Sequence, residues 1–184
     1  MGKQHKTVAV LGAGSWGTAL AIHLARAGLD VRLWGYHADH IAVLQRERCN
    51  QQYLPGVAFP ENLELSSRLE DALSGNELLV LIVIPSHAYR SFLNASKNLF
   101  KPEMSIAWAS KGLEEGTAKL LHQVFSEEVP QCHKLAVISG PTFAKEVARD
   151  MPTAITVASD QDEVANEWRD CLHNGYFRAY TSND

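Results

Sequence analysis

Short apolar runs alternate with helix-forming stretches along most of this chain. Runs rich in Val, Ile and Leu predict strands at residues 7–11, 29–34, 63–66, 78–84, 105–109, 134–138, 153–158 and 176–180. Helix-forming stretches predict helices at residues 18–27, 37–48, 69–73, 86–97, 117–127, 142–148 and 162–172, with Ser86 expected as a cap. Residues 49–62 hold two prolines and a glycine and predict a loop. This alternation predicts an α/β fold in one domain, residues 1–184, with helices on both faces of a doubly wound, mostly parallel sheet.

The first predicted strand leads directly into a glycine-rich turn. Residues 12–17 read Gly-Ala-Gly-Ser-Trp-Gly, so Gly12, Gly14 and Gly17 have a Gly-x-Gly-x-x-Gly spacing before a helix that starts near Ser15. In this pattern the first glycine permits the tight turn, the second lets a pyrophosphate approach bare backbone, and the third lets the helix pack against the strand. The helix N-terminus adds unpaired N–H groups and the positive end of its dipole. The complete strand–turn–helix–strand unit therefore indicates a dinucleotide site.

Polar or glycine-bearing loops follow five of the predicted strands. These loops are residues 12–17, 34–37, 85–87, 110–112 and 140–144. In a doubly wound sheet, ligands bind beyond the carboxyl ends of the strands. We therefore expect the five loops to meet at one edge of the sheet and to form one site.

Two of these loops carry residues suited to an anionic substrate. Lys111 follows a buried strand and precedes a glycine, so its ammonium can hold a phosphate or polarise a substrate oxygen. Gly140 and the next proline form a tight turn, and Thr142 is expected to start and cap the following helix. The N–H groups of this turn can also face an anion. A solvated surface lysine and an ordinary capped helix are the plain alternatives.

The loop after the second predicted strand leaves the choice of dinucleotide open. An acid that binds the ribose is expected about 20 residues after the glycines, but Tyr36 and His37 occupy this region and Asp39 falls inside the next helix. Arg32 lies within the strand, so no arginine follows it to hold a 2′-phosphate. NAD and NADP therefore both remain candidates. His37 and His40 lack the further thiolates or carboxylates of a metal site, so no metal is expected.

Composition narrows the class of protein. The chain has 184 residues, 46% of them hydrophobic, and a formal net charge of −4 without a run of Lys or Arg, so neither nucleic acid nor an anionic membrane is an expected partner. The longest apolar run, residues 78–84, is too short to span a bilayer. The N-terminus lacks a signal-peptide pattern. Cys49, Cys132 and Cys171 are dispersed, as is typical of idle thiols in a reducing cytoplasm.

Taken together, the motifs resemble those of the bacterial-type NAD(P)-dependent glycerol-3-phosphate dehydrogenases. The matching stretches are GAGSWGTALA at residues 12–21, VRLW at 31–34, IPSHAYR at 84–90, ASKGLE at 109–114, GPTFAKEVA at 140–148 and MPTA at 151–154. The resemblance extends over essentially the whole chain, from Val8 to Thr181. SKGLE and GPTFAKEVA are the distinctive ones, whereas the glycine motif is shared with many dinucleotide-binding proteins.

The resemblance implies a Rossmann-like domain of a cytoplasmic oxidoreductase. The family interconverts sn-glycerol 3-phosphate and dihydroxyacetone phosphate with NAD or NADP, in glycerophospholipid biosynthesis. The implied cofactor-binding residues are Gly12, Gly14, Ser15, Trp16, Gly17, Tyr36, His37, Tyr53, Lys111 and Ala144. The implied substrate-binding residues are Lys111, Gly140 and Thr142, with Lys111 polarising the substrate. Tyr36 stands where the family often has an arginine facing the adenosine phosphate, so the resemblance does not decide between NAD and NADP.

The family also has a helical C-terminal domain, which supplies the presumed proton donor. We expect that domain to be absent from this chain, so that the isolated chain binds dinucleotide weakly and turns over little substrate. A homodimer is expected for the full-length enzyme. Two alternatives stay open: another two-domain NAD(P) reductase acting on a keto or imino acid, and a non-catalytic module that senses the dinucleotide. The other reductases should share the glycine loop but not ASKGLE together with GPTFAKEVA, and a sensor needs neither Lys111 nor the Gly140 turn.

Overall fold

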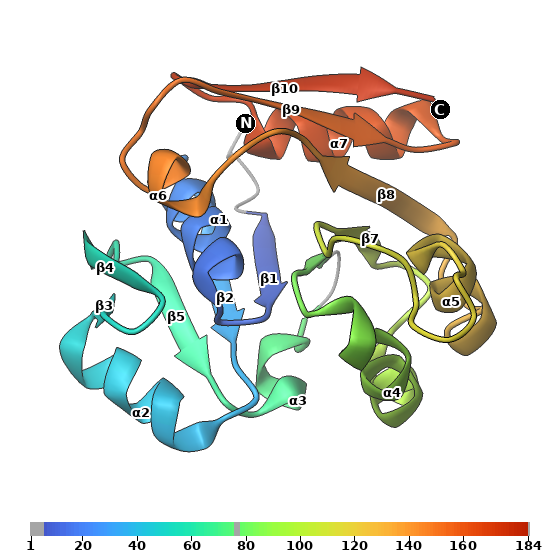
Figure 1. Ribbon diagram of the computed structural model, residues 1–184, viewed down its shortest axis with the longest axis horizontal. Coiled ribbons are helices and arrows are strands. Elements are labelled where there is room, and N and C mark those ends of the chain that lie inside the picture. Colours follow the sequence, from blue (N-terminus) through green and yellow to red (C-terminus); the bar gives the residue numbers. More distant parts are fainter. Residues whose placement is uncertain (1–5, 76–77, 184) are drawn as a thin grey trace.

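A computed structural model describes residues 6–75 and 78–183 and has one large sheet (Figure 1). Its eight strands run in the order β10-β9-β8-β7-β6-β1-β2-β5. Neighbouring strands are parallel except β8 and β9, which are antiparallel. This is the doubly wound, mostly parallel arrangement that the sequence predicts.

The strands of this sheet are β1 Thr7–Leu11, β2 Asp30–Trp34, β5 Leu63–Ser66, β6 Leu79–Ile82, β7 Ser105–Trp108, β8 Lys134–Ser139, β9 Thr153–Ala158 and β10 Phe177–Ser182. The helices are α1 Ser15–Arg26, α2 Ala38–Glu47, α3 Leu69–Ala72, α4 Ser86–Ser96, α5 Leu121–Glu128, α6 Ala144–Val147 and α7 Asp162–Leu172, with a short 3₁₀ turn at Lys97–Leu99. Each overlaps an expected segment, with ends displaced by a few residues.

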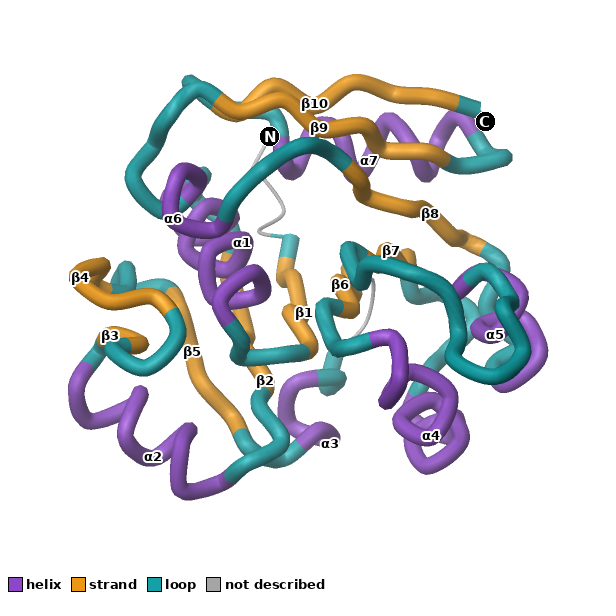
Figure 2. Tube along the Cα trace, viewed as in Figure 1, coloured by secondary structure: helices purple, strands orange, loops and turns teal. Residues whose placement is uncertain are grey.

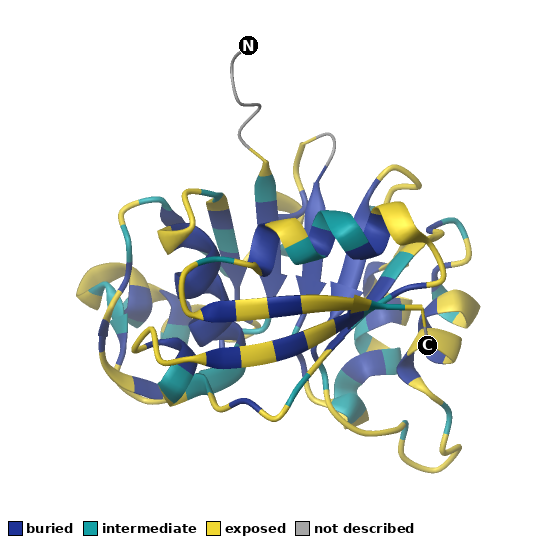
Figure 3. Ribbon diagram, turned by 90° about the horizontal axis from the view of Figure 1, so that it is seen from above, coloured by how far each residue is buried: buried dark blue, intermediate teal, exposed yellow. Residues whose placement is uncertain are grey.

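Two apolar cores lie on opposite faces of the sheet. Alternate residues of β1 enter different cores: Val8 and Val10 pack with α1, while Ala9 and Leu11 pack with α4 and α5. The central strand β6 is buried throughout and β1 is buried except at its first residue, Thr7, as expected for parallel strands covered on both faces. In contrast, buried and exposed residues alternate along β9 and β10 (Figure 3). The edge of the sheet formed by β9 and β10 is therefore covered on one face only, by α7.

Four expectations about local structure were wrong. Residues 49–62 are not all loop, because β3 Cys49–Asn50 and β4 Leu54–Ala58 pair in a small antiparallel ribbon. Ser86 is the first residue of α4 and Pro85 takes the N-cap position. The helix expected from residue 117 begins only at Leu121, and the one expected from Thr142 begins at Ala144. In the last two cases the residues before the helix, 117–120 and 142–143, lie in loops.

The strand order places a crevice at the carboxyl ends of β1 and β6. The chain runs from β1 outward to β2 and β5, then returns to β6 and continues to β7 and β8 in the opposite direction. Connections leaving β1 and β6 therefore diverge, which opens a gap at this switch point. The loops that follow β1 and β6 lie at the same end of the strands (Figure 2). Among the described helices, none has the length and apolar character needed to cross a bilayer.

Candidate functional site

A cleft of about 960 Å³ lies at the carboxyl edge of the sheet. Its lining includes Gly12, Ala13, Gly14, Ser15, Trp16, Gly17, Tyr36, His37, Asp39, His40, Gln52, Tyr53, Pro85, Ser110, Lys111, Thr142, Phe143 and Ala144. These residues come from the loops after β1, β2, β6, β7 and β8, from the first turns of α1, α2 and α6, and from the turn between β3 and β4. The five loops expected to converge do so.

The glycine turn between β1 and α1 has three glycines with different structural roles. Gly12 has a φ of 128°, and a Cβ there would lie 2.4 Å from the carbonyl oxygen of Val83. A Cβ at Gly17 would lie 1.9 Å from the carbonyl oxygen of Gly12. A Cβ at Gly14, by contrast, would have no protein atom within 4 Å and would occupy open space in the cleft. The fold therefore requires Gly12 and Gly17, whereas Gly14 leaves room for a ligand.

The N-terminus of α1 points its free amides at this open space. Gly14 is the N-cap residue and no described side chain caps the helix. The first turn carries no acidic residue. Unpaired N–H groups and the positive end of the helix dipole are therefore left for an anion. A pyrophosphate fits this donor set.

Asn50 holds the glycine turn through hydrogen bonds that the sequence did not indicate. Its side-chain amide donates to the carbonyl oxygen of Ala13 at 3.1 Å and to Oγ1 of Thr18 at 2.9 Å. Its Oδ1 accepts from the backbone N–H of Tyr53 at 3.2 Å. Asn50 is fully buried and ties the turn to the ribbon that carries Tyr53. An asparagine in a segment expected to be loop gave no signal of this role.

Aromatic side chains surround the end of the cleft beyond β2. Tyr36 is 80% exposed and lies edge-on to His37, with 5.2 Å between ring centroids. Tyr53 lies edge-on to His40 at 5.3 Å. Nε2 of His40 is buried and has no hydrogen-bond partner among the described residues. Asp39 is the acid of this region of the cleft.

Lys111 lies at the opposite end of the cleft, beside the first turn of α1. Its Nζ atom is 6.0 Å from the centre of the Trp16 ring. The Oγ atoms of Ser110 and Thr142 are both buried nearby in the lining and lack a hydrogen-bond partner within the described part of the chain. Because buried hydroxyls in native proteins are nearly always hydrogen-bonded, these two are suited to a ligand. Thr142 thus faces the cleft instead of capping α6, where Phe143 is the N-cap residue.

A second hollow of about 410 Å³ adjoins the cleft at Lys111. It shares Trp16, Ser110 and Lys111 with the cleft and adds Gly140 to them. A Cβ at Gly140 would lie 2.8 Å from the carbonyl oxygen of Ala154, so this position has no room for a side chain. The backbone at Gly140 therefore approaches β9 closely.

The structure thus brings together all the residues expected at the site, with Gly140 in the adjoining hollow and the others in the cleft itself. His87, expected in one of the five loops, lies in α4; it is exposed and is not among the lining residues of the cleft. Phe143, which is 70% exposed, was not singled out from the sequence and lines the cleft next to Ala144.

Known proteins resemble this chain in sequence and in structure. Residues 7–165 match the family model described as NAD-dependent glycerol-3-phosphate dehydrogenase N-terminus. A glycerol-3-phosphate dehydrogenase (NAD(P)+) of Escherichia coli O1:K1 is 46% identical over all of this chain, which covers 54% of that protein. The chain therefore spans about half the length of the curated relatives it matches.

Solved structures give the same result. The crystal structure of glycerol-3-phosphate dehydrogenase from Coxiella burnetii superposes with a TM-score of 0.92 at 44% identity, over 97% of this chain and 54% of that one. A glycerol-3-phosphate dehydrogenase of Plasmodium falciparum shares the fold, with a TM-score of 0.87 at 20% identity over 97% of this chain and 53% of that one. Family model, sequence identity and fold agree, and the chain belongs to the NAD-dependent glycerol-3-phosphate dehydrogenase family, whose N-terminal part it matches.

Proposed function

We propose that this chain binds NAD or NADP in the cleft and supplies the dinucleotide-binding half of a glycerol-3-phosphate dehydrogenase. The observation that carries the proposal is the open space at Gly14 beneath the uncapped N-terminus of α1. A pyrophosphate there would accept hydrogen bonds from the amides of the turn, and such charge-assisted bonds are stronger than neutral ones. Membership of the family supports the choice of a nicotinamide dinucleotide.

The lining of the cleft suggests how a dinucleotide would lie in it. Gly12, Gly14, Ser15, Trp16 and Gly17 would surround the pyrophosphate. Tyr36, His37 and Tyr53 would border the adenosine end, and Lys111 and Ala144 the nicotinamide end. Aromatic rings at the adenosine end offer stacking surfaces for the adenine base.

The proposed substrates are sn-glycerol 3-phosphate and dihydroxyacetone phosphate, bound near Lys111, Gly140 and Thr142. This follows from the names of the relatives and from the groups around Lys111. The buried hydroxyl of Ser110 lies with Lys111 in the cleft and in the adjoining hollow, and that of Thr142 lies in the cleft; neither hydroxyl has a hydrogen-bond partner among the described residues. We place the activity in the cytoplasm, in a homodimer of the full-length enzyme.

The chemistry follows from these positions. The nicotinamide, when bound, supplies the hydride that passes to carbon 2 of dihydroxyacetone phosphate. The Lys111 ammonium would stabilise the negative charge that develops on the carbonyl oxygen. The proton that completes the alcohol would come from the helical domain of the full-length enzyme. The hydroxyl of Thr142 and the backbone at Gly140 hold the substrate, and the turn at Gly14 fixes the dinucleotide.

Titration of the chain with NADH and with NADPH tests the proposal. Energy transfer from tryptophan to the reduced nicotinamide reports binding, because Trp16 lines the cleft. We expect saturable binding of at least one of the two dinucleotides and competition by its oxidised form. Absence of saturable binding of both, measured by calorimetry as well, would refute the proposal.

A further inference from the structure

Lys111 lies in a loop, residues 109–120, that contains neither helix nor strand. Most of its residues are exposed, and Gly112 and Gly116 have positive φ values of 92° and 84°. Leu113, its first large apolar residue after Lys111, is 48% exposed. Burial of apolar side chains therefore does not fix this segment, and something else must determine where Lys111 lies.

Glu114 is the residue of this loop that is held most firmly. Its side chain is 11% exposed and forms an ion pair with Arg90 of α4. Nε of Arg90 donates to Oε1 at 2.6 Å and Nη2 donates to Oε2 at 3.0 Å, which is a two-point contact between guanidinium and carboxylate. Thr117 donates its hydroxyl to the same carboxylate, and the backbone N–H of Glu114 donates to the carbonyl oxygen of Lys119 at 2.9 Å. Hydrogen bonds thus connect Glu114 to Thr117 and Lys119 within the loop.

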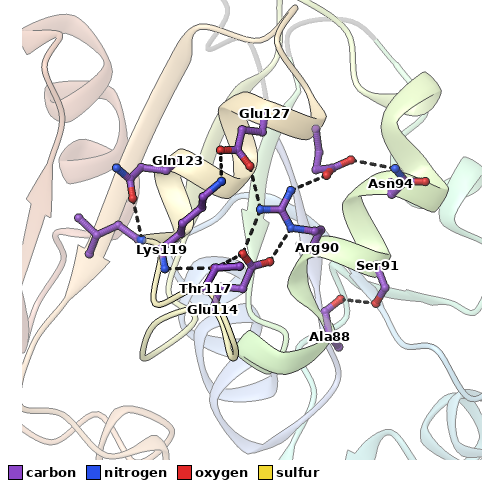
Figure 4. A network of polar contacts seen from close by, with 11 residues as sticks. Ala88, Arg90, Ser91, Asn94, Glu114, Thr117, Lys119, Gln123 and Glu127 are labelled. Carbon is purple, nitrogen blue, oxygen red and sulfur yellow. Dashed lines mark hydrogen bonds and ion pairs between the residues drawn. The ribbon is translucent and has the colours of Figure 1, made fainter.

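The same guanidinium also joins α5. Nη1 of Arg90 donates to Glu128 at 2.6 Å and Nη2 donates to Glu127 at 2.8 Å (Figure 4). Lys119 forms an ion pair with Glu127 at 2.5 Å. One arginine therefore connects α4, the loop and α5 through three carboxylates. Hydrogen bonds from Arg90 and Thr117 lower the pKa of Glu114 to about 2, so the cluster stays ionised at neutral pH.

Charge balance makes Arg90 the residue on which this arrangement depends. The cluster has three carboxylates against two cations, Arg90 and Lys119. Without Arg90, the carboxylates of Glu114, Glu127 and Glu128 would repel one another, balanced only in part by Lys119 and by Lys97 near Glu128. The loop would stay bound to α5 through Lys119 and Glu127, but its part around Glu114 would lose its ion pair and be free to move. Lys111, three residues before Glu114, would move with that part.

We propose that Arg90 and Glu114 are positioning residues, which hold the loop so that the Lys111 ammonium stays beside Trp16 at the cleft. The role in substrate binding rests on the function proposed above, but the placement of Lys111 can be measured without it. A lysine cannot replace Arg90 here, because an ammonium lacks the planar fork that bonds both carboxylate oxygens.

The test follows Lys111 directly by NMR. Reductive methylation with ¹³C-formaldehyde labels the lysine amines of the 184-residue chain, and Lys111→Arg identifies the Lys111 signal. With Nζ 6.0 Å from the centre of the Trp16 ring, that signal should carry a ring-current shift. We expect Arg90→Met, Arg90→Lys and Glu114→Gln to move it to the position of a solvent-exposed lysine. Glu128→Gln, which removes a partner of Arg90 on α5 and leaves Glu114 in place, should leave it unchanged.

Two outcomes would overturn the proposal. One is an unchanged Lys111 signal in folded Arg90→Met and Glu114→Gln, and the other is an equal displacement in Glu128→Gln. Arg90 is one-third exposed, so its loss should be tolerated, and Glu114→Gln provides a milder second test.

Binding of sn-glycerol 3-phosphate in the presence of NADH provides the functional measurement. We expect about tenfold weaker binding of that probe in Arg90→Met, equivalent to one charge-assisted hydrogen bond, with a much smaller change for NADH. If the Lys111 signal moves as expected while the wild type binds neither compound, the positioning role stands and the proposed function fails.

Discussion

Replacing Gly14 by valine should separate binding from folding at the glycine turn. Gly14 has φ −77° and ψ −173°, an extended conformation that L-residues adopt, and its missing Cβ faces open space. Valine should therefore fit the fold and fill the space proposed for the pyrophosphate. Loss of two charge-assisted hydrogen bonds at about 1.5 kcal/mol each gives about 3 kcal/mol, or roughly a hundredfold weaker dinucleotide binding.

The assay pairs NADH titration with urea unfolding. Stability should stay equal to that of the wild type or rise by up to about 1 kcal/mol, because a residue with a side chain restricts the unfolded chain more than glycine does. Ala27→Val, at the exposed C-terminal end of the same helix, is the control and should leave NADH affinity unchanged. Wild-type affinity in Gly14→Val would show that the anion does not lie at this turn, and the reasoning would be wrong.

Three further predictions concern other parts of the molecule. Lys111→Ala should abolish binding of sn-glycerol 3-phosphate in the NADH complex while NADH affinity, measured in the same titration, falls only a few-fold. His23 is buried, and its Nε2 donates to the Leu172 carbonyl oxygen; burial lowers its pKa, so the folded state resists protonation. The free energy of unfolding should therefore fall as the pH drops below about 6.5, by at most about 1.4 kcal/mol per pH unit. Urea unfolding at pH 7.5 and 5 should show this loss, and a His23→Gln variant that keeps the full loss would contradict it. Tyr89→Phe should leave stability unchanged or raise it by about 1–2 kcal/mol in urea unfolding, because its buried hydroxyl has no partner among the described residues, and a clear loss would contradict this.

The sequence predicted the sheet and most of the site because both depend on local patterns. The apolar runs of β1 and β6 are buried on both faces, and the loops after parallel strands meet by the geometry of the fold. Gly12, Gly14 and Gly17 could be assigned because each glycine answers a separate steric need. These features need no knowledge of distant contacts.

What the sequence did not show depends on contacts between distant residues. Asn50 braces the glycine turn from 37 residues away, and Arg90 meets Glu128 across 38 residues. The ribbon β3–β4 forms although its second strand contains a proline and a glycine, because Leu54 and Val57 are buried in the core with α1. Thr142 has the residue type of a helix cap, but its hydroxyl is buried at the cleft. The local preferences of single residues for helix, strand or cap positions could not have predicted these contacts.

A crystal structure of the chain with NADH tests the central claim most directly. We expect pyrophosphate oxygens at hydrogen-bonding distance, about 2.7–3.2 Å, from the backbone amides of Ser15 and Trp16, with the nicotinamide toward Lys111. A dinucleotide bound elsewhere, with the space at Gly14 filled by protein atoms, would contradict the account.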